Sequence, residues 1–182
     1  MAKSLKTELM WRRVAVVAGL IVVCGGILIW WCCFATTTTV LLVRHADRQG
    51  SQDALSSAGL ARAQTLVHVL QKSGIDAIYQ SDAVRTQQTA APVTSALGIT
   101  PTTVTATNID SLVNDIRASH RGQTVLVVGH SNTVPQIIAA LGGPTLPNID
   151  ENEFDNLFVL QTGCCCGRGA RLVNLQYGAA SP

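Results

Sequence analysis

Two short apolar runs, each with a histidine one or two residues after its end, constrain the fold of this chain most. Val40 to Val43 reads VLLV and precedes Arg44 and His45, and Thr124 to Gly129 reads TVLVVG and precedes His130. Neither run alternates apolar with polar residues, as a strand with one solvated face does. Both are therefore predicted to be strands buried in the middle of a sheet, with helices on either side.

The rest of the chain after Thr36 alternates β-branched segments with amphipathic ones, which predicts βαβ units. We expect an α/β fold, a three-layer sandwich with a mostly parallel central sheet, whose last two strands form a hairpin. Pro92 is expected to kink the second helix or end it early. The expected strands are 39–44, 77–80, 102–105, 124–129, 157–161 and 171–176, and the expected helices are 57–73, 83–97, 111–119 and 133–141.

The segment from Val14 to Ala35 contains 22 residues without a charge. A helix needs about 20 apolar residues to cross a bilayer, so one N-terminal transmembrane helix is predicted. Arg12 and Arg13 are expected to stay cytoplasmic, which places the later residues outside the membrane, in the periplasm. A cleaved signal peptide is the alternative, although its apolar region is usually about 7 to 15 residues. The expected division is a cationic segment 1–13, a transmembrane helix 14–35 and one folded domain 36–182.

Charge and cysteine content exclude some classes of function. The net charge is +2, with +3 in the first thirteen residues and −1 in the remainder. No basic stripe with interleaved aromatic residues occurs, so no nucleic-acid partner is expected. The six cysteines lack the spacing of a zinc site, and neither a metal nor a cofactor is expected. The consecutive cysteines 164–166 either pair between chains or stay free; the oligomeric state is left open.

The residues that follow the predicted strands suit a phosphate group. In an open parallel sheet, ligands bind beyond the carboxyl ends of the strands, so His45 and His130 are expected to meet in one crevice. Arg44 and Arg48 flank His45, and Arg85 follows the strand expected at 77–80. Arginine offers bidentate donors to phosphate oxygens. A neutral histidine is a nucleophile when its other ring nitrogen donates to a fixed acceptor.

Three segments in this order resemble the motifs of a known family, the histidine phosphatase or phosphoglycerate mutase-like superfamily. They read RHADR at 44–48, SDAVRTQQTA at 81–90 and GHSNT at 129–133. The resemblance covers about residues 39–177 and implies a histidine phosphatase-like fold for the domain.

The resemblance also implies roles for single residues. His45 is the expected nucleophile, which becomes phosphohistidine, and His130 is the second histidine at the phosphoryl group. Arg44 and Arg85 are expected phosphate ligands. Arg48 is similar to an arginine in the acid-phosphatase branch of the family and is expected to be a further phosphate ligand.

The proton donor for the leaving group is the least defined part of this resemblance. The acid-phosphatase branch has an aspartate directly after the second histidine, where this chain has Ser131. Asp47 is the preferred candidate, ahead of Asp110 and of Asp150 or Glu151 in an acidic loop. Without an acid, the substrate is expected to have a good leaving group, such as a phosphohistidine or a pyrophosphate.

Together these features predict a metal-independent phosphomonoesterase. It is expected to hydrolyse a phosphate ester or phosphoanhydride through a phosphohistidine on His45, in a domain anchored to the membrane by residues 14–35. The expected substrate is a phosphorylated small molecule or a component of the cell envelope. A catalytically weak phosphate-recognition module and a mutase-like phosphotransferase are the alternatives, and the absence of a second basic cluster disfavours the mutase.

Overall fold

The structure is a computed structural model that describes residues 2–34, 37–163 and 169–181. The chain divides into two compact units, Met1–Ala35 and Thr36–Pro182, which are described separately. The predicted turn that contains cysteines 164–166 lies outside the described residues.

The first unit contains a single helix, α1 (Ala2–Phe34). Within it, Met10–Leu28 forms a stretch of 19 residues that is long and apolar enough to cross a membrane by length and composition. A signal sequence near an N-terminus meets the same criterion, so the helix fits both alternatives that the sequence leaves open. The helix is longer than the predicted span 14–35, because it also includes the polar residues from Ala2 onward.

The second unit is built on one six-stranded sheet with the order β3-β2-β4-β1-β5-β6. The strands are β1 (Thr38–Arg44), β2 (Ile75–Ser81), β3 (Thr102–Val104), β4 (Thr124–Gly129), β5 (Asn156–Thr162) and β6 (Arg171–Gln176). The first four strands run parallel to one another, whereas β5 and β6 are antiparallel to their neighbours. The prediction of a mostly parallel α/β sheet is therefore confirmed.

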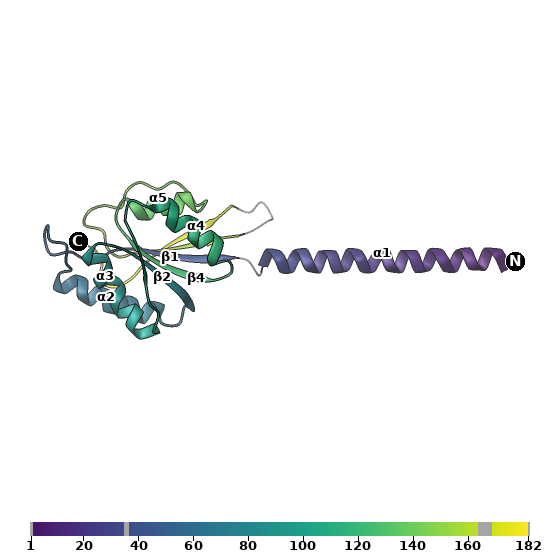
Figure 1. The fold of residues 1–182 in the computed structure, drawn as a ribbon, viewed down its shortest axis with the longest axis horizontal. Helices are drawn as coiled ribbons and strands as arrows, with labels where there is room; N and C mark the ends of the chain where they lie inside the picture. Colours follow the sequence, from purple (N-terminus) through teal and green to yellow (C-terminus); the bar gives the residue numbers. More distant parts are fainter. Residues whose placement is uncertain (1, 35–36, 164–168, 182) are drawn as a thin grey trace. The chain divides into compact units, whose positions relative to one another are not determined.

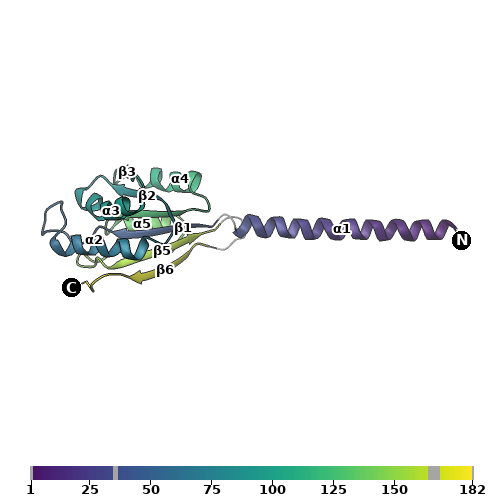
Figure 2. The ribbon, with the colours of Figure 1, turned by 90° about the horizontal axis from the view of Figure 1, so that it is seen from below.

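Helices cover both faces of this sheet, as the two views of the ribbon show (Figures 1 and 2). They are α2 (Ser57–Leu70), α3 (Val84–Leu97), α4 (Ile109–Ser119) and α5 (Thr133–Ala140). Val40 and Leu42 of β1 pack in a core with α4 and α5. Leu41 and Val43 of the same strand pack in a second core with α2 and α3. Successive side chains of β1 thus enter opposite layers, which is why the run VLLV is apolar throughout.

Helix α3 does not end early at Pro92, one of the two outcomes expected from the sequence, because it continues past this residue to Leu97. Proline lacks an N–H and so removes one intrahelical bond, the one to the carbonyl of Gln88, while the turns on either side keep theirs. The helix ends instead at Gly98, whose φ of 67° is in the left-handed region that glycine adopts most easily.

Helix α2 starts against the loop that follows β1. Ser56 caps the helix, since its Oγ accepts a hydrogen bond from the N–H of Gly59 at 3.1 Å. A Cβ atom on Gly59 would overlap the backbone oxygen of Asp47. Glycine at this position therefore lets the helix approach the loop that contains the first histidine.

Candidate active site

The two motif histidines lie at the carboxyl ends of neighbouring parallel strands. In the pairing of β1 with β4, Arg44 is opposite Gly129. The N–H of His45 donates to the carbonyl of Gly129 at 2.9 Å, so the alignment continues one residue beyond the ladder. The ring centroids of His45 and His130 are 5.6 Å apart and the rings are inclined by 63°. The expectation that both histidines meet in one crevice agrees with this geometry.

The ring of His45 is held in the orientation and tautomer that a nucleophile needs. Its Nδ1 lies 2.9 Å from the carbonyl oxygen of Ala46, which can only accept, so Nδ1 carries the proton and Nε2 has the free lone pair. The pKa of His45 is lowered to about 4, chiefly by burial and also by the charges of Arg44 and Arg85, against the opposing effect of the Ala46 hydrogen bond. The ring is therefore neutral at pH 7.

A second contact fixes the backbone beside this ring. The N–H of Ala46 donates to Oγ1 of Thr89 at 3.0 Å. Thr89 belongs to α3, so the loop after β1 is tied to the helix that also contains Arg85. The sequence gives no signal for this role of Thr89, because the two residues are 43 positions apart.

His130 has a partner on each ring nitrogen. Nδ1 accepts from Nη2 of Arg85 at 3.1 Å, because a guanidinium can only donate. Nε2 therefore carries the proton and donates to Oγ of Ser81 at 2.8 Å. Burial lowers the pKa of His130 and the Arg85 charge lowers it further. At neutral pH the ring is uncharged, and its orientation is fixed by the hydrogen bonds with Arg85 and Ser81.

Arg44 is buried and fixed at one end of its guanidinium. Its Nη1 donates to the backbone carbonyls of Asp150 at 2.5 Å, Glu151 at 2.9 Å and Glu153 at 3.1 Å. Its Cζ lies 4.3 Å from the ring centroid of Phe154, a cation–π contact. Nε is buried and has no hydrogen-bond partner among the described residues. A buried N–H of a charged group without a partner is costly, and an anionic ligand would satisfy it.

The other two motif arginines border the same space. Arg85 is fixed through Nη1, which donates to Oδ1 of Asp53 at 2.6 Å. Arg48 is exposed and forms an isolated bridge with Leu55. Both side chains line a pocket of about 500 Å³ together with Arg44, His45 and His130. The structure thus brings together five of the six residues that the sequence predicts for the site.

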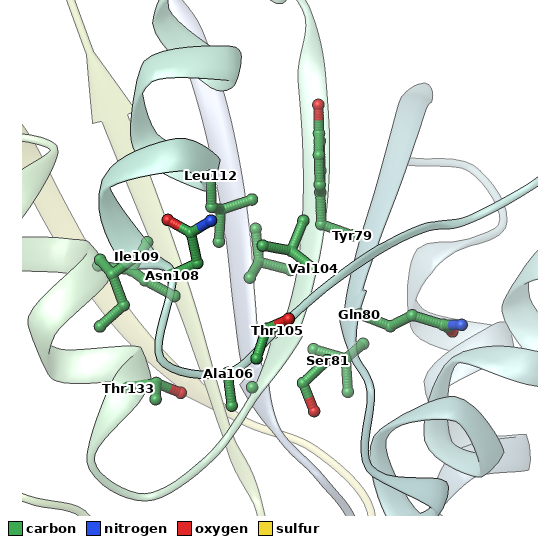
Figure 3. A pocket seen from close by; sticks show the side chains of 14 residues that line it. Tyr79, Gln80, Ser81, Val104, Thr105, Ala106, Asn108, Ile109, Leu112 and Thr133 are labelled. Atoms are coloured by element: carbon green, nitrogen blue, oxygen red, sulfur yellow. The ribbon is translucent and has the colours of Figure 1, made fainter.

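A second cavity adjoins this pocket between α4, α5 and the ends of β2 and β4 (Figure 3). Ala106, Ile109 and Thr133 line both spaces. The cavity has a volume of about 30 Å³, against about 500 Å³ for the pocket with the histidines and arginines. It is too small for a substrate, whereas the pocket with the histidines and arginines has room for a small molecule.

The sixth predicted residue, Asp47, does not line the pocket and is instead bound to Arg62. Its Oδ2 accepts from Nε of Arg62 at 2.7 Å, and Oδ1 lies 3.4 Å from Nη2 of the same arginine. Burial alone would raise the pKa of Asp47, but the hydrogen bonds from Arg62 outweigh it and the pKa is lowered. An acid needs a raised pKa near the working pH, so the prediction that Asp47 donates the proton does not fit this geometry.

Of the other candidate acids, Glu151 borders the pocket. It is the one carboxylate among the residues that line this pocket in the described part of the chain. Asp110 lies in the first turn of α4 and Asp150 at the start of the acidic loop, and neither lines the pocket. No group of three histidine, cysteine or acidic side chains that could hold a metal ion occurs within residues 2–34, 37–163 and 169–181.

Comparison with known proteins relates the first part of the domain to a family. Residues 40–108 match the histidine phosphatase superfamily (branch 1), a stretch that contains the first two motifs. The structure of the protein histidine phosphatase SixA complexed with tungstate is 19% identical, with a TM-score of 0.54, and the match covers 70% of this chain and 94% of that one. No curated protein sequence matches the chain.

Two further structures share the fold. A provisionally named phosphohistidine phosphatase SixA from Agrobacterium tumefaciens is 25% identical, with a TM-score of 0.55, covering 80% of this chain and 99% of that one. A provisionally named alpha-ribazole-5'-P phosphatase from Escherichia coli is 17% identical, with a TM-score of 0.60, covering 76% and 96%. These matches show that the domain has a histidine phosphatase-like fold.

Proposed function

We propose that the protein is a membrane-anchored phosphatase that hydrolyses its substrate through a phosphohistidine on His45, without a metal ion or cofactor. The main support is the state of His45, a buried neutral ring whose Nδ1 donates to a backbone carbonyl and whose Nε2 is free. The pocket beside this ring has arginines on its walls.

The reaction has two displacements at phosphorus. Nε2 of His45 attacks the phosphorus atom, and the bond between phosphorus and the leaving-group oxygen or nitrogen breaks. Water then attacks the phosphohistidine, the P–N bond breaks, and inorganic phosphate leaves. Arg44, Arg48 and Arg85 bind the phosphoryl oxygens, over which charge spreads in both transition states. His130 contacts the same group from the neighbouring strand.

Glu151 replaces Asp47 as the proposed proton donor to the leaving group. Its backbone is fixed because its carbonyl accepts from Arg44 at 2.9 Å, while its side chain borders the pocket. Glu151 is exposed, so its contribution depends on the substrate. Leaving groups that depart without protonation, such as a pyrophosphate, need it least, and simple alkyl esters need it most.

Hydrolysis is favoured over mutase chemistry by the basic residues of the pocket. Three arginines, and no lysine, line it in the described part of the chain. This set suits one phosphoryl group, whereas a mutase must bind two phosphorylated positions of its substrate. The proposed substrate is a phosphorylated small molecule or an envelope component that carries a single reactive phosphate.

The proposed location of the domain is the outer side of the cytoplasmic membrane. The supporting features are the apolar stretch Met10–Leu28 and the cationic residues Arg12 and Arg13 near its start. Protease added to spheroplasts is expected to digest the domain, and a tag placed before residue 2 is expected to stay protected. Protection of the domain in intact spheroplasts, with digestion after lysis, would show the opposite orientation.

Turnover of an activated aryl phosphate by the full-length chain in detergent tests the proposed activity. His45→Ala and Arg44→Ala are each expected to lower kcat/KM by at least about a thousandfold, as removal of a nucleophile or an oxyanion ligand does. His68→Ala is the matched control, because His68 is exposed on α2, away from the pocket. Tight binding of inorganic phosphate without turnover would identify a phosphate-recognition module instead.

A further inference from the structure

The loop formed by residues 49–55 leads from the first motif to helix α2 and makes hydrogen bonds to helix α3. Its ends are joined by the bridge between Arg48 and Leu55 and by a hydrogen bond from the N–H of Gln49 to the carbonyl of Ala54 at 2.9 Å. The N–H of Leu55 donates to Oε1 of Gln88 on α3 at 2.8 Å. The loop that follows Arg48 is thus fastened to the helix that contains Arg85.

Asp53, in the middle of this loop, makes the most direct connection. Its Oδ2 accepts from the N–H of Val84 at 3.0 Å. Its Oδ1 accepts from the N–H of Arg85 at 3.4 Å and from Nη1 of the same residue at 2.6 Å. Ala83, at the N-cap of α3, has no side chain that can cap the helix, so Asp53 takes that role from a distant part of the sequence.

These contacts act on the geometry of Arg85 more than on stability. The side chains of Asp53 and Arg85 are 48% and 26% exposed, and ion pairs this exposed contribute little to the free energy of unfolding. They do fix the guanidinium, whose Nη1 is bound to Asp53 while Nη2 is bound to Nδ1 of His130. A planar group held at both ends keeps one orientation at the edge of the pocket.

We propose that Asp53 is a positioning residue for catalysis, which holds the Arg85 guanidinium in the orientation that meets the phosphoryl oxygens. The inference rests on the proposed function, because it assigns Arg85 to the phosphate. Asp53 does not line the pocket and acts only through Arg85. Stabilisation of the transition state depends on preorganised donors. A guanidinium that is free to move therefore loses more of its effect on the transition state than of its affinity for the bound phosphate.

Asp53→Asn is the informative variant, because its single amide oxygen can still accept from the backbone N–H of Val84 at the start of α3, while the charge opposite Arg85 is lost. In the full-length chain in detergent, kcat for an activated aryl phosphate is expected to fall about tenfold or more, while the Kd for inorganic phosphate rises only about threefold. Asp76→Asn is the control, since Asp76 also accepts a backbone N–H, from Thr124 at 2.8 Å, at the opposite end of the strands. It is expected to leave both values unchanged.

A double-mutant cycle with Arg85→Lys separates positioning from a general structural effect. If Asp53 acts through Arg85, Asp53→Asn lowers kcat in the wild-type background but has little further effect in Arg85→Lys. Equal losses in both backgrounds, or no loss in the wild type, overturn the inference. If the wild type has no turnover, the proposed function fails. The wild type, the two single variants and the double variant then test the role of Asp53 by phosphate binding. A threefold rise in the Kd for phosphate on Asp53→Asn in the wild-type background alone supports the positioning role, and any other pattern contradicts it.

Discussion

The carboxylate of Asp47 and the guanidinium of Arg62 form an ion pair with an Oδ2 to Nε distance of 2.7 Å. The pair adjoins the loop after β1, since Asp47 is two residues after His45. Arg62 also donates through Nη1 to the carbonyls of Tyr177 at 3.2 Å and Ala179 at 2.7 Å. It therefore joins the first motif, helix α2 and the C-terminal segment, and Asp47 supports the site from outside the pocket.

Arg62→Ala is expected to destabilise the domain strongly. Asp47 and Arg62 are 17% and 5% exposed, and removal of one partner leaves a largely buried charge unpaired and two carbonyls without a donor. Losses of about 3 kcal/mol in the free energy of unfolding are typical of such changes. Denaturant unfolding measures the loss. Arg117→Ala is the control, because Arg117 donates to one carbonyl, that of Ala140, at an exposed site; equal effects of the two variants would contradict the role given to the pair.

Glu151→Gln is expected to change the dependence of the rate on the leaving group. If Glu151 donates the proton, kcat/KM falls about a hundredfold for an alkyl phosphate and less than about threefold for a substrate with a good leaving group. Glu153→Gln is the matched control, because the carbonyls of both residues accept from Arg44 but only Glu151 lines the pocket. A uniform effect across leaving groups would exclude Glu151 as the acid.

The burial of His45 predicts a pH-dependent stability. Its pKa is about 4 in the folded domain, and about 6.5 in an unfolded chain. Between these values the unfolded state binds more protons, so stability is fully present above pH 6.5 and is lost as the pH falls toward 4. The loss between pH 7 and pH 4.5 is expected to be about 2 kcal/mol smaller in His45→Gln than in the wild type. Denaturant unfolding at the two pH values measures it, and identical losses would contradict the depressed pKa.

Much of the fold and of the site follows from sequence patterns with a simple physical basis. The runs that precede Arg44 and His130 are apolar on both faces because each strand lies between two helical layers. Polar residues directly after such strands must emerge at the same edge of a parallel sheet. The histidines and arginines of the motifs are therefore predictable without knowledge of any side-chain contact.

Other features depend on contacts between distant segments. Asp47 is part of the first motif but is turned toward Arg62, which approaches it only when α2 packs against the loop. Asp53 has no feature of its own that indicates its contact with Arg85, because the 49–55 loop determines that contact. The second partner of His130, Ser81, becomes evident only when β2 lies beside β4.

The phosphohistidine on His45 is the central claim, and trapping of this intermediate tests it most directly. The full-length chain is mixed with a labelled phosphate donor, quenched within the first turnover and digested for mass spectrometry. The account predicts a phosphoryl group on His45 that is stable in alkali and lost in acid, and that is absent in His45→Ala but present in His68→Ala. Turnover without such a species under single-turnover conditions, or a phosphoryl group on another residue, would contradict it.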